Sequence, residues 1–154
     1  MELKKYLGVI PAFYACYDDA GNVSPERTRA LARYLLGKGV KGLYVGGSSG
    51  ECIYQSVQER KVILENVMAE VGGKLTVIAH VACNNTLDSQ ELARHAESLK
   101  VDAIAAIPPI YFHDNFYVFF SFLLHFTYPL IIIFQVSPRT LSLFHLQHSV
   151  RFSL

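Results

Sequence analysis

The stretch Gly42-Leu43-Tyr44-Val45-Gly46-Gly47-Ser48-Ser49-Gly50-Glu51 decides the fold of this chain of 154 residues. The apolar run at residues 43–45 is bounded by glycine on both sides, which is typical of a strand buried on both faces. The glycines that follow permit positive φ and close approach of a ligand, while Ser48 and Ser49 offer hydroxyl donors. We expect a strand followed by a turn that holds a carboxylate or phosphate. A tight surface turn is the simpler alternative.

A helix is predicted directly after this turn. Ser56 and Glu59 have the spacing of the reciprocal capping pattern that begins a helix. Apolar residues then recur at roughly helical spacing, at Val62, Ile63, Val67 and Val71. Strand, turn and helix therefore form one βα unit, and in parallel α/β folds the loop after a strand's C-terminal end is the usual place for chemistry.

The βα pattern repeats along the first part of the chain. Strands are predicted at residues 8–13, 42–46, 75–81 and 102–107. The first helix begins at Ser24-Pro25 and ends near Gly37 and Gly39, and the third covers residues 86–100, with Leu87, Leu92, Ala96 and Leu99 on its apolar side. The fold class is thus α/β, as roughly the first four units of a (βα)8 TIM barrel, whose usual size is roughly 250 residues.

The composition changes at Asp114. Most of the phenylalanines follow it, and no charged residue lies between Phe116 and Phe134. We predict that residues 1–113 are the N-terminal half of a barrel and that residues 114–154 are an unrelated hydrophobic tail, produced by a shifted reading frame or a misjoined exon. Two alternatives are a transmembrane anchor, which His125 and Pro129 disfavour, and a short buried strand near residues 130–134.

Charge and cysteine content restrict the function classes. Residues 1–113 hold equal numbers of basic and acidic side chains, and no basic patch suggests nucleic acid. No signal peptide is expected at the N-terminus, and the three separated cysteines favour a reducing, cytoplasmic location. No metal site is expected, because His145 and His148 lack further ligands nearby and residues 18–22 lack the pattern of a calcium loop.

Several motifs together resemble one enzyme family. The run Gly47-Ser48-Ser49-Gly50-Glu51, followed by Glu59, resembles the first signature of the N-acetylneuraminate lyase and dihydrodipicolinate synthase family. Further similar segments follow in order and spacing: residues 8–12, 79–82, 89–93 and 109–111. The resemblance extends from residue 1 to about residue 113, and residues 56–60 and 79–81 are more similar to the sialic acid lyase branch than to the synthase branch.

The resemblance implies class I aldolase chemistry, in which pyruvate is held as a Schiff base on a lysine. It implies that Ser48, Ser49 and Gly47 bind the substrate carboxylate. It also implies a proton relay for Tyr111, for which a packed or subunit-interface tyrosine is the alternative. It implies no metal and no other cofactor, a small-molecule substrate such as pyruvate, another 2-oxo acid or sialic acid, and homotetramers for full-length relatives.

Two further residues of the similar segments have predicted roles. His80 lies within an apolar strand, where a hydrogen-bonded core histidine is favoured over a site residue. Glu51 stands where the family keeps an acid, and we expect it to orient the turn through backbone amides. The family's usual Thr-Pro-Phe near the first strand is replaced by Ala15-Cys16-Tyr17.

The resemblance places the Schiff-base lysine on the sixth strand, beyond residue 113, whereas the last lysine of this chain is Lys100. We therefore expect a truncated relative of N-acetylneuraminate lyase, the enzyme that cleaves sialic acid to N-acetylmannosamine and pyruvate, inactive as this chain. The alternatives are a synthase-like condensation of pyruvate with an aldehyde, and a non-catalytic or membrane-anchored half-barrel module.

Overall fold

The computed structural model describes residues 3–107. Tyr111 and the predicted tail, including the hypothetical anchor at Phe116–Phe134, lie outside the described residues. The elements in chain order are η1 (Leu3–Tyr6), β1 (Ala12–Phe13), α1 (Pro25–Gly37), β2 (Gly42–Val45), η2 (Ser48–Gly50), η3 (Cys52–Tyr54), α2 (Val57–Val71), β3 (Thr76–His80), α3 (Thr86–Ser98) and β4 (Ala103–Ala105).

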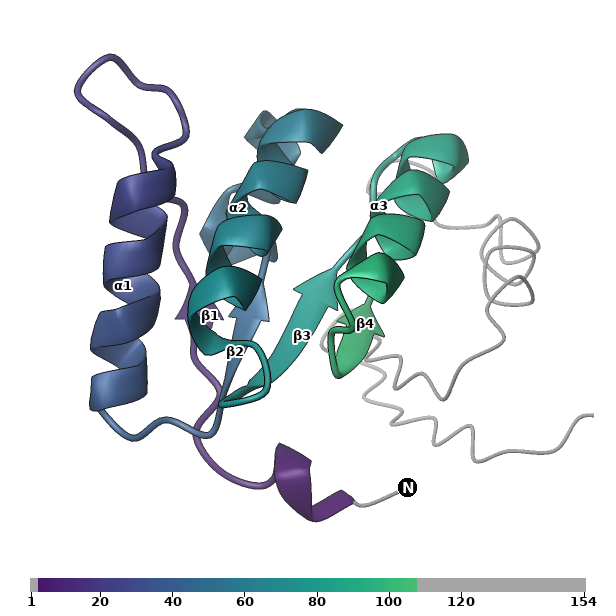
Figure 1. Ribbon diagram of the computed structural model, residues 1–154. Helices are drawn as coiled ribbons and strands as arrows, with labels where there is room; N and C mark the ends of the chain where they lie inside the picture. The colour runs from purple at the N-terminus through teal and green to yellow at the C-terminus, as the bar shows by residue number, and fades with distance from the viewer. Residues whose placement is uncertain (1–2, 108–154) are drawn as a thin grey trace, which may run out of the picture.

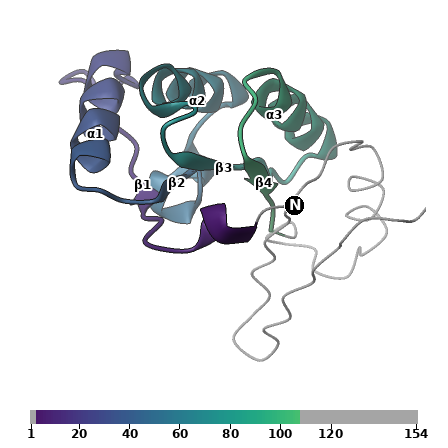
Figure 2. The same cartoon turned by 60° about the horizontal axis from the view of Figure 1, so that its bottom comes forward.

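The strands form one parallel sheet in the order β1-β2-β3-β4. Across the sheet, Tyr44 pairs with Ala12 on one side and with Ile78 on the other. The helices α1, α2 and α3 all lie on the same face of the sheet, as Figures 1 and 2 show. This arrangement confirms the predicted βα repeat, because each helix connects two neighbouring parallel strands.

Alternate residues of the strands pack into two separate clusters. Leu43 and Val45 point toward the helices, where they join the main core with residues such as Val67 of α2. Tyr44, between them, contacts the smaller cluster of Ile78, Ala103 and Ala105 on the other face. This period of two lets the same short strand serve both faces of the sheet.

Local capping places the helices as the sequence predicted. The Ser24 side chain accepts a hydrogen bond from the amide of Arg27, and Pro25 occupies the first turn of α1. At α2 the full capping box is present: Ser56 Oγ accepts from the amide of Glu59, whose carboxylate accepts from the amide of Ser56 at 2.7 Å. The start of α2, which follows the serine turn, is therefore fixed by two reciprocal hydrogen bonds.

The first strand is shorter than predicted. The carbonyls of Val9 and Pro11 accept hydrogen bonds from the amides of Lys41 and Tyr44, so this segment does lie beside the next one. Proline has no amide to donate, however, and Gly8 has a φ of 129°. The regular strand is therefore limited to Ala12–Phe13.

The apolar side of the third helix was predicted correctly except at its start. Leu92 and Ala96 are buried in α3, whereas Leu87 is 72% exposed.

Within residues 3–107, no helix combines the length and the apolar character needed to cross a membrane.

Candidate functional site

The serine turn of the opening motif is a single turn of 3-10 helix at the C-terminal end of β2. The carbonyls of Gly47 and Ser48 accept hydrogen bonds, both of 2.9 Å, from the amides of Gly50 and Glu51. Ser48 and Ser49 are exposed, and within residues 3–107 neither hydroxyl has a hydrogen-bond partner. Because the first amides of a helical turn have no carbonyl partner in that turn, hydroxyls and amides together can receive an anion.

The glycines of the turn serve two different purposes. Only Gly46 has positive φ, at 73°. Gly47 is extended, but a Cβ there would lie 2.5 Å from Cε1 of Tyr44. A Cβ on Gly50 would lie 2.8 Å from the carbonyl oxygen of Phe13. Of the three glycines, Gly46 therefore supplies the positive φ, whereas the other two provide space for Tyr44 and Phe13.

The left-handed conformation is adopted by Glu51, with a φ of 61°. Its amide closes the turn onto Ser48, but within the described residues its exposed carboxylate accepts no backbone amide. The expectation that the side chain of Glu51 orients the turn is wrong. That role belongs to Gln55, whose Nε2 donates to the carbonyl of Gly50 at 3.0 Å.

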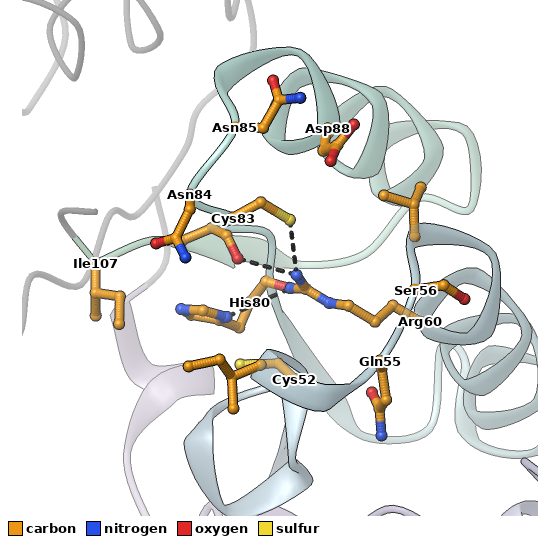
Figure 3. Close-up of a pocket in the computed structure, with 13 residues that line it drawn as sticks. Cys52, Gln55, Ser56, Arg60, His80, Cys83, Asn84, Asn85, Asp88 and Ile107 are labelled. Atoms are coloured by element: carbon orange, nitrogen blue, oxygen red, sulfur yellow. Dashed lines mark hydrogen bonds between the residues drawn. The ribbon is translucent and has the colours of Figure 1, made fainter. Parts of the chain in front are cut away.

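A cavity of about 260 Å³ opens beside the turn, between the starts of α2 and α3. Its lining includes Cys52, Arg60, His80, Cys83 and Asp88 (Figure 3). It begins next to the turn, and Ser48 and Ser49 are not among its lining residues. The structure therefore separates the two predicted hydroxyl donors from the cavity that Arg60 and His80 line.

Arg60 joins α2 to the end of β3. Its Nη2 donates to the carbonyl of His80 at 2.7 Å, and its Nη1 donates to the carbonyl of Ala82 at 2.9 Å and contacts Sγ of Cys83 at 3.0 Å. Sequence analysis missed this residue, since an arginine on a helix is usually solvated. Its signal was its spacing: it precedes Ile63 and Leu64 by three and four residues, which places it on the buried face of the helix.

His80 is a hydrogen-bonded core residue, as predicted. It is 6% exposed, and its Nδ1 lies 3.4 Å from Nη2 of Arg60. Burial, together with the neighbouring Arg60 charge, lowers the pKa of His80 to about 4. The ring is therefore neutral at physiological pH and adds no charge to the site.

The three cysteines are free thiols. Burial raises the pKa of Cys52 and Cys83, and the positive charge of Arg60 partly opposes that rise at both.

Within the described part of the chain, no group of three or more His, Cys, Asp or Glu residues could hold a metal ion. The Asp18–Asn22 segment is a turn, as predicted, in which Asp18 Oδ1 accepts from the amides of Ala20 and Asn22.

Comparison with known proteins assigns the chain to a family. The model of the dihydrodipicolinate synthetase family matches residues 5–149. The chain belongs to that family. A curated N-acetylneuraminate lyase of Mediterraneibacter gnavus is 76% identical over 111 residues, which are 72% of this chain and 35% of that protein. Within the family, the curated relatives that the chain matches include N-acetylneuraminate lyases, of whose length it spans about a third.

Solved structures agree with a partial barrel. A Ruminococcus gnavus sialic acid aldolase, solved as its catalytic lysine mutant, matches with a TM-score of 0.76 and 70% identity, covering 79% of this chain and 40% of that one. An Escherichia coli prophage protein of the dihydrodipicolinic acid synthase family, in complex with pyruvate, matches with a TM-score of 0.77 and 26% identity, covering 86% of this chain and 45% of that one. The chain spans between a third and a half of these relatives.

The matches differ in how far they extend along the chain. The family model reaches residue 149, whereas the curated lyase aligns over 111 residues. The predicted boundary at residue 113 therefore stays a prediction, as does the role of Tyr111.

Proposed function

We propose that this chain carries the carboxylate-recognition part of a pyruvate-dependent lyase site. The observation that supports the proposal is the pair of exposed hydroxyls on Ser48 and Ser49, which have no partner within residues 3–107. They stand beside the amides of a helical turn at the C-terminal edge of a parallel sheet. Hydroxyls and amides at such an edge suit a carboxylate.

The proposed ligand class is a 2-oxo acid, with pyruvate as the smallest member and sialic acid as the complete substrate. The names of the relatives support this choice, since they are sialic acid lyases and a pyruvate-bound protein of the same family. They favour the lyase over the synthase-like condensation. In the complete enzyme the reaction would be cleavage of sialic acid to N-acetylmannosamine and pyruvate.

The covalent step of that reaction requires a lysine that forms an iminium, which acts as the electron sink for carbon–carbon cleavage. The last lysine in the sequence is Lys100, which is exposed immediately after α3. We therefore propose that the chain of 154 residues binds the 2-oxo acid without forming the Schiff base. Tyr111 keeps its proposed relay role for a complete site.

The proposal is tested by adding pyruvate to the ¹⁵N-labelled chain and following amide chemical shifts. Saturable shifts centred on residues 47–50 are expected, and Ser48→Ala and Ser49→Ala should each weaken binding roughly fivefold to tenfold, as loss of a charge-assisted hydrogen bond implies. The matched control is Ser98→Ala, whose hydroxyl bonds the carbonyl of His95 at the far end of α3. Shifts that are absent from the turn, or unaffected by both serine variants, would contradict the proposal.

We further propose a cytoplasmic location for the chain and homotetramers for its full-length relatives. The free thiols of Cys16, Cys52 and Cys83 support a reducing compartment. Alkylation of free thiols in intact cells tests the cytoplasmic location. The three cysteines should react with the reagent, whereas protein from an oxidising compartment would carry oxidised cysteines that do not react.

A further inference from the structure

Arg60 is a buried cation that has no carboxylate partner within residues 3–107. It is 5% exposed, and its hydrogen-bond partners are two backbone carbonyls, the thiol of Cys83 and the ring of His80. Its Nε is buried without any partner in the described part of the chain. The His80 ring is neutral because its pKa is about 4. A positive charge that is buried among neutral groups is costly to the fold, and its field is poorly screened by solvent.

This charge lies beside Gly46, where the segment that leads into the serine turn begins. A methyl group placed on Gly46 would lie 3.9 Å from both Nε and Nη2 of Arg60, and Gly46 precedes Ser48 by two residues. The turn at residues 46–51 contains no basic side chain of its own. None of the acidic groups near Arg60 forms an ion pair with it in the described part of the chain: Glu59 accepts hydrogen bonds from Ser56, Glu51 is exposed, and Asp88 lines the cavity.

We infer that Arg60 supplies the positive potential that attracts the substrate carboxylate to the Ser48–Ser49 turn, acting across Gly46 without touching the ligand. The inference rests on the proposed carboxylate site. An arginine suits this task because it stays charged when buried, whereas a buried lysine or histidine is readily neutralised. The structure also explains why the guanidinium cannot move to the ligand, since the end of β3 holds both of its terminal nitrogens.

The test neutralises Arg60 without removing it. Sγ of Cys83 lies 3.0 Å from Nη1, so the carboxylate of Cys83→Asp can pair with the guanidinium. Cys83→Asn has the same size without the charge. Asn85→Asp provides the charge-matched control: it adds the same charge at the N-cap of α3, in the lining of the same cavity, where aspartate caps as well as asparagine.

Pyruvate affinity is compared by amide shifts. Cys83→Asp should weaken binding roughly threefold to tenfold relative to Cys83→Asn, and more than Asn85→Asp does, because only the first variant pairs with Arg60. Equal weakening by the two aspartate variants would overturn the inference, since the added charge alone would then account for the loss. So would equal affinities of Cys83→Asp and Cys83→Asn.

A second readout needs no ligand. Burial raises the pKa of Cys52, three residues beyond Ser49, and the Arg60 charge partly opposes that rise. In Cys83→Asp the Cys52 pKa should rise by roughly half a unit or more relative to Asn85→Asp, measured from the pH dependence of alkylation by iodoacetamide at that cysteine. Cys16, whose neighbouring cation is Arg27, is the internal reference. An unchanged Cys52 pKa contradicts the inference even if pyruvate binds, whereas a raised Cys52 pKa without pyruvate binding contradicts the proposed function alone.

Discussion

The side chain of Gln55 donates a hydrogen bond to the carbonyl of Gly50, with 3.0 Å between Nε2 and the oxygen. The same nitrogen donates to the hydroxyl of Tyr17 at 3.1 Å. Tyr17 lies after β1 and Gln55 immediately precedes the N-cap of α2. One amide therefore connects the serine turn with two other segments at the C-terminal edge of the sheet.

Removing this amide should loosen the turn. We expect Gln55→Met, which keeps the length of the side chain, to lower the free energy of unfolding by about 1–2 kcal/mol, because it leaves a carbonyl and a hydroxyl without their donor. Pyruvate should bind several-fold more weakly. Hydrogen exchange at the amides of residues 50 and 51 and a pyruvate titration measure both effects. Gln58→Met, at an exposed position of α2, is the control, and an equal loss there would refute the role of Gln55.

Ser56 and Ser49 should differ in what they contribute: Ser56 should stabilise the fold, and Ser49 should bind pyruvate. Ser56→Ala removes the capping box of α2 and should cost about 1 kcal/mol of unfolding free energy. Ser49→Ala removes an exposed hydroxyl without a partner in the described chain, so stability should change by less than about 0.5 kcal/mol while pyruvate affinity falls. Denaturant unfolding of both variants checks the pair. A destabilised Ser49→Ala would show that this hydroxyl is structural.

Stability should fall in mildly acidic solution because of His80. Its pKa is lowered from 6.5 to about 4, first by burial and then by Arg60. Above pH 6.5 the ring is neutral in both the folded and the unfolded chain, so the contribution is fully present. Between pH 6.5 and 4 the unfolded chain binds the proton first, and about 3 kcal/mol is lost.

The measurement for His80 is the denaturant midpoint as a function of pH. His80→Gln keeps a neutral polar side chain at this position and should flatten the dependence between pH 6.5 and 4.5. A wild-type curve that is already flat there, or a variant with the same slope as the wild type, would show that His80 is not the responsible group.

The ring of Tyr44 leaves no room for a side chain at position 47. A Cβ there would lie 2.5 Å from Cε1 of the ring, so Gly47→Ala should cost about 1–3 kcal/mol through displacement of the ring or the turn. Gly37→Ala is the matched control, because nothing lies within 4 Å of its Cβ position and the residue is helical. Replacing Tyr44 by valine should recover part of the loss at Gly47. Equal stabilities of the two alanine variants would disprove the steric explanation.

Local sequence signals predicted much of this fold. The capping pair Ser56 and Glu59 and the Ser24-Pro25 helix start are short-range hydrogen-bonding patterns, so neighbouring residues suffice to recognise them. The four parallel strands followed from short apolar runs separated by helical spacing. His80 was correctly placed in the core, because every second residue of a buried strand shares its face.

Contacts that the local sequence pattern does not encode account for most of what the sequence did not predict. The need for glycine at position 47 comes from the ring of Tyr44, and the need at position 50 comes from the carbonyl of Phe13 on another strand. Arg60 was missed because its partners, at the end of β3, lie at least 20 residues away along the chain. Leu87 matched the helical pattern, but it lies in the first turn of α3 and is exposed.

We propose that the 154-residue chain binds a 2-oxo acid at the serine turn without forming a Schiff base. The most direct test is to incubate the 154-residue protein with pyruvate and borohydride and to measure its intact mass, with a full-length N-acetylneuraminate lyase treated in parallel. The account predicts that only the full-length enzyme gains a reduced pyruvate adduct. An adduct on a single lysine of this chain, lost in Ser48→Ala, would contradict it by revealing a nucleophile at the turn.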